Sequence, residues 1–343
     1  MRYVNLGASG LKVSRIALGM MTFGTPNWRS WVRPEEQAVP VVRRALDAGI
    51  NVFDTADMYS AGLSEEITGR LLVRYAPRDE IVIATKLFFP VDLAFKGGNA
   101  PGPKPPEKPN ASGLSRKRIM AAVDASLKRL GVDCIDLYQI HRFDPHTPVE
   151  ETMEALHDIV KAGKVRYLGA SSMWTWQFAT MQFAAERHGW TRFISMQNHY
   201  NLAYREEERE MIPYCRATGV GLLPWSPLAR GFLAGNRALA DQSQQGATDR
   251  ANTDDIALKF YYRDADFAVV EALGRVATAR GVSNATVAYA WLLRQPGVSC
   301  PIVGASRPEQ LDDAIAALDF ALSAEEDAAL KAAYRPHAVL GHT

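Results

Sequence analysis

Cysteine is scarce in this sequence: only Cys134, Cys215 and Cys300 occur among 343 residues. No two of them form a close Cys-x-x-Cys pair, so the sequence favours neither a disulfide framework nor a zinc site. An excess of one charge sign is also lacking, because 39 Lys and Arg face 38 Asp and Glu for a formal net charge of +1. This balance argues against nucleic-acid and membrane-surface partners.

Long apolar runs are absent as well. No stretch approaches the roughly 18 residues of a membrane span, and the N-terminus MRYVNLGASG has no apolar signal region. With 47% hydrophobic and 22% charged residues, the composition is that of an ordinary globular protein with a large core. We therefore expect a cytoplasmic protein that does not enter the membrane.

The sequence does contain a repeated strand-and-helix unit. Eight short apolar runs are predicted as buried strands: Ile16–Gly19, Asn51–Asp54, Ile81–Lys86, Ile135–His141, Val165–Ser171, Phe193–Asn198, Val220–Trp225 and Cys300–Gly304. Amphipathic periodicity between them predicts helices, among them Glu35–Ala48, Arg118–Leu130, Val149–Ala162 and Glu206–Ala217. Glycine, the usual residue after a helix end, stands at four helix-to-strand junctions: Gly49, Gly131, Gly163 and Gly219.

Eight such units predict an α/β fold, a closed (β/α)8 TIM barrel. The alternative is an open doubly wound sheet, which needs a glycine-rich phosphate loop after the first strand. The residues at that place, LGMMTFG, contain no Gly-x-Gly-x-x-Gly. The barrel is therefore favoured.

We expect one domain over residues 1–343. Residues 1–15 predict an N-terminal hairpin that pairs Tyr3–Leu6 with Leu11–Ser14. Residues 88–114, rich in Pro and Gly, predict a loop after strand three, and the polar residues 236–253 predict another after strand seven. Both loops would lie at the C-terminal mouth of the barrel, the first either as a lid or as a disordered surface loop.

Polar side chains stand where the predicted strands end. Asp54, Lys86 and His141 close three of these runs. Other runs end with, or are followed by, polar residues: Ser171, Gln197, Asn198 and Ser226. The C-terminal strand ends of a barrel converge on one mouth, so we expect these groups to face one another.

The chemistry of carbonyl reduction selects among these residues. Tyr59, five residues after Asp54, is a candidate proton donor, but a free phenol has a pKa of about 10. An ammonium such as that of Lys86 favours the phenolate and lowers that pKa, and Asp54 would keep Lys86 charged. His141 would polarise the substrate carbonyl. The spacing of these residues does not indicate a metal site.

Six segments resemble the aldo-keto reductase superfamily, including its channel-subunit-like and aryl-alcohol-dehydrogenase-like branches. They follow one another in the family's order: DTADMYS, IATK, QIHRFD, MQNHYNL, PWSPLARGFLAG and PIVGASRPEQLDDA. The resemblance implies a catalytic tetrad of Asp54, Tyr59, Lys86 and His141. It also implies NADPH-dependent reduction of an aldehyde or ketone, with NADH less favoured.

Cofactor contacts follow from the same resemblance. Trp225 would stack on the nicotinamide, near Asp54, and Ser171, Ser172 and Gln197 would hold its carboxamide. The pyrophosphate would lie on the segment formed by Ser226, Pro227, Leu228, Ala229, Arg230 and Gly231. The adenosine end would meet Gly304, Ser306, Arg307, Gln310 and Asp313.

The residues themselves support the adenosine end. Ser306 with Glu309 predicts a capping box that opens a helix, and Arg307 beside it suits a 2′-phosphate. Three positions depart from the family pattern. Many relatives have Asn at the position of Ser172, a Glu-Asn pair at Asp313-Ala314, and in some cases a lysine at Asn236.

Aromatic residues near the predicted mouth indicate a mostly apolar substrate pocket, with Trp28, Phe88 and Trp174 as candidate contacts. Similar bacterial proteins act on varied aldehydes, keto sugars, quinones and toxin-derived ketones. Two other functions stay open: a redox-sensing NADPH-binding module with subsidiary turnover, and a metal-dependent barrel hydrolase or lyase. The sequence does not indicate an oligomeric state.

Overall fold

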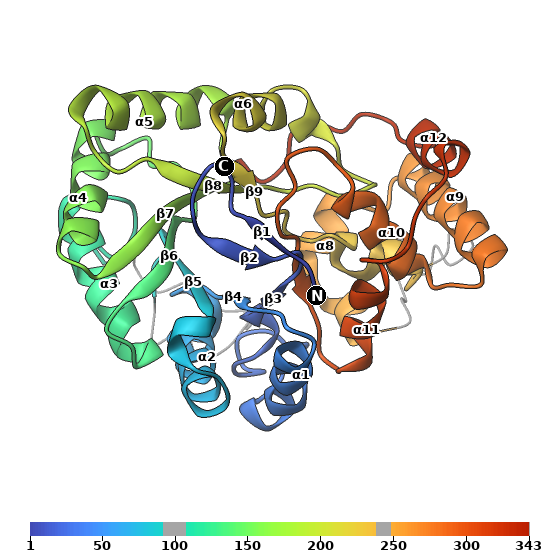
Figure 1. Cartoon of the computed structure of the whole chain (residues 1–343), viewed down its shortest axis with the longest axis horizontal. Helices are drawn as coiled ribbons and strands as arrows, with labels where there is room; N and C mark the ends of the chain where they lie inside the picture. The colour runs from blue at the N-terminus through green and yellow to red at the C-terminus, as the bar shows by residue number, and fades with distance from the viewer. Residues whose placement is uncertain (92–107, 238–247, 343) are drawn as a thin grey trace.

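A parallel sheet of eight strands forms the centre of the molecule, in the order β10-β3-β4-β5-β6-β7-β8-β9 (Figure 1). The computed structural model describes residues 1–91, 108–237 and 248–342. The strands are β3 (Ala17–Gly19), β4 (Val52–Asp54), β5 (Val82–Leu87), β6 (Ile135–Ile140), β7 (Val165–Ser171), β8 (Phe193–Gln197), β9 (Gly221–Leu222) and β10 (Ile302–Gly304). Each lies at one of the eight predicted runs.

The sheet closes where β9 meets the chain leading into β10. The Leu222 amide donates to the Gly297 carbonyl at 3.1 Å, and the Leu222 carbonyl accepts from the Ser299 amide at 3.0 Å. The Ile302 amide donates to the Pro224 carbonyl at 2.9 Å. The predicted (β/α)8 barrel is confirmed.

Helices surround the sheet (Figure 1). They are α1 (Glu35–Asp47), α2 (Leu63–Tyr75), α3 (Arg116–Leu130), α4 (Val149–Lys161), α5 (Thr175–His188), α6 (Met211–Thr218), α7 (Asp249–Thr253), α8 (Asp255–Phe260), α9 (Asp264–Arg280), α10 (Asn284–Leu293), α11 (Glu309–Ala316) and α12 (Ala324–Ala332). Their inward faces follow helical spacing: α1 buries Ala38, Val41, Val42 and Ala45. Gly131 (φ 65°) and Gly219 (φ 73°) follow α3 and α6 in the left-handed conformation that favours glycine.

One predicted helix is shorter than expected. In place of Glu206–Ala217, the structure has a single 3₁₀ turn, η4 (Glu206–Glu208), and the α-helix begins only at Met211. The carboxylate of Glu206 accepts hydrogen bonds from the hydroxyl of Tyr334 and the amide of His337. These long-range contacts fix the turn in a way that helical periodicity does not reveal.

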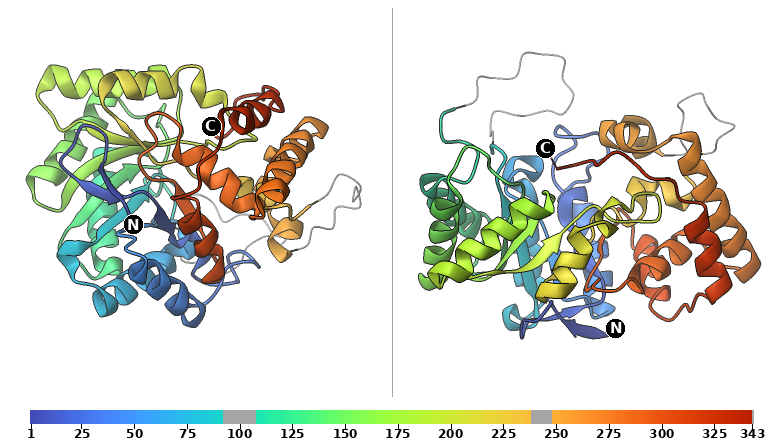
Figure 2. Two further views of the ribbon diagram at one scale, coloured as in Figure 1. Left: turned by 45° about the vertical axis from the view of Figure 1, so that its right-hand side comes forward. Right: turned by 90° about the horizontal axis from the view of Figure 1, so that it is seen from above.

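The N-terminal hairpin is confirmed. β1 (Tyr3–Asn5) pairs antiparallel with β2 (Lys12–Ser14) and lies at one end of the barrel (Figure 2, right). Leu6 and Val13 pack with Val52 and Leu137 from the barrel strands. The hairpin therefore covers one end of the barrel and leaves the other end for the site.

The two predicted mouth loops lie partly outside the described residues, namely at 92–107 and 238–247. The prediction that the first loop is either a lid or a disordered surface loop concerns residues 92–107, which lie outside the described residues. The second loop ends in the short helix α7 (Asp249–Thr253). The Thr248 hydroxyl caps this helix by accepting a hydrogen bond from the Ala251 amide at 3.1 Å. Within the described ranges, no helix is long and apolar enough to cross a membrane.

Candidate active site

An ion pair lies at the ends of β4 and β5. The fully buried Lys86 ammonium donates to Asp54 Oδ2 at 2.6 Å and to the Thr55 carbonyl at 2.7 Å. The other oxygen of Asp54 accepts from Gln139 Nε2 at 3.0 Å and from Gln197 Nε2 at 2.8 Å. An ionised carboxylate accepts hydrogen bonds on both oxygens, so this arrangement supports Asp54 as an anion.

Lys86 stays charged in this site. Burial works to lower the pKa of its ammonium, but the negative charge of Asp54 and the hydrogen bonds to Asp54 and Tyr59 outweigh burial and raise the pKa above its ordinary value. Its Nζ lies 5.0 Å from the centroid of the Tyr59 ring. A permanent cation therefore stands beside the phenol.

A tight turn places Tyr59 in front of the pair. After the half-buried Tyr59, Ser60, Ala61 and Gly62 have φ values of 50°, 54° and 94°. Residues with a side chain rarely adopt the φ values of Ser60 and Ala61, so tertiary contacts must hold the turn.

The contacts that hold this turn begin two residues earlier, at Asp57. Its amide donates to the Lys86 carbonyl at 3.1 Å, and its Oδ2 accepts from Arg118 at 2.8 Å. Burial raises the pKa of Asp57 to about 7, although Arg118 works to lower it. Asp57 therefore ties the turn to β5 and α3.

His141 follows β6 and faces Tyr59, with ring centroids 5.9 Å apart. Burial, Arg142 and Lys86 together hold the pKa of its imidazole well below the ordinary value. The ring is therefore neutral at pH 7. Its Nδ1 is buried, and no described residue forms a hydrogen bond with it.

The structure thus brings the four predicted residues Asp54, Tyr59, Lys86 and His141 together at one mouth. They combine a phenol, a charged ammonium held by a carboxylate, and a neutral imidazole. Such a set can hand a proton to an oxygen and stabilise the charge that forms there.

Two further residues of the site were not selected from the sequence. Gln139 binds Asp54 and accepts from Gln197 Nε2 at 3.1 Å. It stands two residues before His141, and period-two alternation places both on one face of β6, a signal that was available. Phe89 packs edge-on against His141 at 5.1 Å, and no local pattern distinguishes it from Phe88.

The predicted carboxamide-binding residues lie on neighbouring strand ends. Ser171 Oγ donates to the Gln197 carbonyl at 2.8 Å, and Trp225 Nε1 donates to Ser172 Oγ at 2.9 Å. One face of the Trp225 indole stacks on His199, with centroids 4.2 Å apart and planes at 12°. The half-exposed indole beside a hydroxyl that can still donate fits a flat amide-bearing ring.

The predicted pyrophosphate segment, residues 226–231, has an unusual backbone. Ser226, Ala229, Arg230 and Gly231 have φ values of 53°, 48°, 61° and 98°. Left-handed residues in a turn form concavities of backbone N–H groups that suit anions, so the segment fits a phosphate. The Arg230 guanidinium is paired with Asp254 at 2.6 Å, which leaves it less available to a ligand.

The predicted capping box at Ser306 and Glu309 is wrong. α11 begins at Glu309 with Pro308 before it, so Ser306 lies too far from the helix to cap it. Instead the Gln310 side chain reaches back and accepts from the Ser306 amide at 2.7 Å and the Arg307 amide at 3.3 Å. Arg307 is exposed, next to the open Gly304, and thus accessible to a phosphate.

Asp313, predicted at the adenosine end, is engaged within the protein. Its Oδ1 accepts from Ser283 Oγ at 2.6 Å and from Thr286 Oγ1 at 3.3 Å. These contacts join α11 to the start of α10.

The three candidate substrate contacts lie at different distances from the tetrad. The Trp28 ring is 6.0 Å from Tyr59, and Phe88 reaches His141 only through Phe89, 5.1 Å away. Trp174, 40% exposed, packs against His342 at 4.8 Å, a residue of the C-terminal tail.

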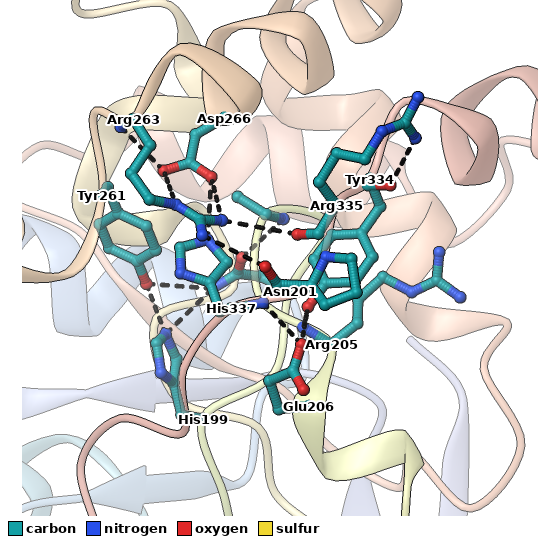
Figure 3. Close-up of polar contacts among 12 residues, drawn as sticks. His199, Asn201, Arg205, Glu206, Tyr261, Arg263, Asp266, Tyr334, Arg335 and His337 are labelled. Carbon is teal, nitrogen blue, oxygen red and sulfur yellow. Dashed lines mark hydrogen bonds and ion pairs between the residues drawn. The ribbon is translucent and has the colours of Figure 1, made fainter.

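The C-terminal tail, residues 333–342, runs back to the mouth and is tied down by a polar cluster (Figure 3). His337 Nε2 lies 2.8 Å from Asp266 Oδ1, and the His337 amide donates to Glu206 at 2.8 Å. The Leu340 amide donates to the Tyr204 hydroxyl at 2.9 Å. A Cβ on Gly341 would lie 3.5 Å from the Trp225 ring, so the tail borders the predicted nicotinamide position.

No cluster of three or more His, Cys, Asp or Glu side chains that would hold a metal occurs in the part of the chain that the structure describes. All three cysteines are free.

Comparison with known proteins gives consistent matches along the chain. A model of the Aldo/keto reductase family matches residues 15–335. The chain is 47% identical over 349 residues to versiconal hemiacetal acetate reductase from Aspergillus parasiticus, covering 99% of this chain and 98% of that protein. It is 48% identical over 356 residues to a candidate aryl-alcohol dehydrogenase from Schizosaccharomyces pombe (99% and 97% covered), and 45% identical over 351 residues to an aldo-keto reductase from Fusarium vanettenii (99% and 93% covered).

Proposed function

Since the chain belongs to the aldo/keto reductase family, we propose that it reduces an aldehyde or ketone to the alcohol with NADPH, and that Tyr59 gives the proton. Membership of the family makes it an oxidoreductase that uses a nicotinamide cofactor on small-molecule carbonyl compounds. The observation that carries the finer proposal is the buried Lys86–Asp54 pair beside Tyr59, opposite the neutral His141.

The nicotinamide, when bound, supplies a hydride to the carbonyl carbon and is itself oxidised. The Tyr59 hydroxyl donates to the carbonyl oxygen and passes its proton to it. Lys86 stabilises the phenolate that remains until solvent returns a proton. We assign the His141 proton to Nε2, where it donates to the same oxygen, because Nδ1 has no partner.

The remaining residues hold the reactants in our proposal. Trp225 would stack on the nicotinamide, while Ser171, Ser172 and Gln197 would hold its carboxamide. The turn at residues 226–231 holds the pyrophosphate through its N–H groups. Trp28 and Phe88 line the substrate side, and Trp174 lies at its edge.

A preference for NADPH over NADH rests on Arg307, the exposed cation beside Gly304 and Ser306. Changing Arg307→Ala is expected to raise the KM for NADPH about tenfold, because a charge-assisted contact to the 2′-phosphate is lost. The KM for NADH should change little. Arg166→Ala, at an exposed arginine of β7, is the matched control, and equal effects on both coenzymes would remove Arg307 from this role.

The direct test is a panel of aldehydes and ketones, in which the oxidation of NADPH is followed by its absorbance. The panel is then repeated with NADH. Turnover that Tyr59→Phe abolishes supports the proposal. Tight NADPH binding with only residual turnover across the panel would favour the alternative redox-sensing module. The cytoplasmic location and the single-domain organisation stay predictions.

A further inference from the structure

Arg142 directly follows His141, yet the proposed reaction makes no use of it. Its guanidinium carbon lies 5.6 Å from the ring centroid of Phe89, which packs on His141. Its Nη1 donates to the His141 carbonyl, while its buried Nε has no hydrogen-bond partner among the residues that the structure describes. The charge lies near enough to the site to lower the pKa of His141. A cation therefore stands beside the reacting groups.

Three other arginines of low exposure have carboxylate partners. Arg118 pairs with Asp57 at 2.8 Å, Arg129 with Glu65 at 2.6 Å and Arg230 with Asp254 at 2.6 Å. Over residues 1–91, 108–237 and 248–342, no carboxylate forms an ion pair with Arg142. Arg142 therefore differs from these three arginines because no described carboxylate neutralises its charge.

A charge taken out of water without a partner is costly. Burial lowers the pKa of Arg142 to about 10, which still leaves it charged at pH 7. An anion that enters the site would replace the water that Arg142 has lost.

We propose that Arg142 determines substrate specificity by binding an anionic oxygen, most simply a carboxylate, on the same molecule whose carbonyl meets Tyr59 and His141. This inference rests on the function proposed above. The aromatic rings of Phe89 and Trp28, on either side of His141 and Tyr59, favour an aryl body between the two polar groups. The substrate class is thus aromatic aldehydes or ketones that carry a carboxylate.

The cofactor phosphates do not fill this role. The predicted phosphate contacts follow β9 and β10, whereas Arg142 follows β6. In the strand order, β10 and β6 are separated by β3, β4 and β5, and β9 and β6 are separated by β7 and β8, so both phosphate segments begin at least three strands away from Arg142. The anion beside Arg142 must therefore come from the substrate.

A second role for Arg142 would be to brace the His141 backbone through the Nη1 contact. Bracing affects every substrate alike, whereas anion recognition affects only the charged ones. The ratio of kcat/KM for a carboxylate substrate to that for its neutral isostere therefore separates the two roles.

The experiment compares meta- and para-carboxybenzaldehyde with the matching formylbenzamides, following NADPH oxidation. For at least one isomer, the wild-type protein should prefer the carboxylate about tenfold or more, the size of one charge-assisted contact. Arg142→Gln should bring that ratio close to one, and Arg142→Lys should restore part of it. Arg166→Gln, which removes an exposed arginine of β7, should leave the ratio as it is.

Two results overturn the proposal: a wild-type ratio near one for both isomers, or an Arg142→Gln variant that loses activity equally on both members of each pair. Reduction of the neutral formylbenzamides by the wild type shows that the reductase function holds even where the Arg142 proposal fails. If Arg142→Gln does not fold, the wild type still decides. Benzoate should then inhibit benzaldehyde reduction about tenfold more strongly than benzamide does, and equal inhibition overturns the proposal.

Discussion

Two buried polar clusters of this protein can be compared directly. The strand-end cluster joins Asp54 and Lys86 with two glutamines of the barrel. The tail cluster joins Glu206, Asp266 and the residues of the C-terminal tail (Figure 3). In both, a carboxylate accepts several hydrogen bonds away from water.

The clusters differ in what holds their members. Strands β4, β5, β6 and β8 carry the strand-end cluster, and the backbone ladder positions its side chains. The tail cluster joins η4, α9 and the chain end, which depend on the side-chain contacts themselves. Similar chemistry therefore holds the proposed catalytic groups in one place and docks the tail in the other, and perturbation should separate the two.

The largest contrast is expected from two matched tyrosine variants. Tyr59→Phe should lower kcat/KM for carbonyl reduction about 10²- to 10⁴-fold, since the proton donor is lost, while NADPH binding measured by fluorescence persists. Tyr334→Phe removes a hydroxyl from the tail cluster and should lower Tm with little change in turnover. Retained activity in Tyr59→Phe would remove this residue from its proposed role.

Next in size is the loss of one carboxylate from each cluster. Asp54→Asn leaves the fully buried Lys86 without a counter-charge and should cost about 3–5 kcal/mol in the free energy of unfolding. Asp266→Asn should cost less, about 1–2 kcal/mol, because the Asn side chain can keep a hydrogen bond to His337 and because the other partner, Arg263, is 41% exposed and can turn to water. Urea unfolding measures both, and equal losses would contradict the contrast drawn here.

A smaller and more local effect is expected from Glu206→Gln. The change weakens two contacts that the carboxylate accepts from the tail, by about 1–2 kcal/mol in total. Amide hydrogen exchange should then speed up at residues 335–342 and stay slow in β4, β5 and β6. Uniform acceleration across the barrel would show that the tail is not a separate unit.

The smallest effect is a difference in pH dependence. For Glu206 and Asp266, burial works to raise the pKa, but hydrogen bonds from Tyr334 and His337 respectively outweigh it and leave the pKa below the ordinary value. Their contribution to stability is present above the ordinary carboxyl pKa and is lost as the pH falls through the folded values. The tail should therefore loosen in acid.

The contribution of Asp57, beside the strand-end cluster, to stability changes with pH in the opposite direction. Its pKa is raised by burial to about 7, so its contribution is present at low pH and is lost as the pH rises through about 7. Asp57→Asn should flatten the dependence of Tm on pH between about 4 and 7. Asp319→Asn, at a carboxylate that is 93% exposed, should leave that dependence unchanged.

The sequence alone determined the barrel, the hairpin and the meeting of Asp54, Tyr59, Lys86 and His141. The physical reason is that strand runs, helical periodicity and junction glycines are local signals, and a closed parallel barrel brings all C-terminal strand ends to one mouth. The resemblance to a family added the roles of the cofactor residues, which remain proposals.

Only the tertiary structure decided the remaining features of the site. Gln139 as a partner of Asp54, the turn in place of the helix start at Glu206, the failed cap at Ser306 and the unpaired Arg142 all depend on contacts between distant segments. A side chain's partner is set by which segments pack together, and no local pattern encodes that choice. The sequence therefore determined where the reacting groups gather, and the packing decided which of them are neutral, paired or left with a free donor.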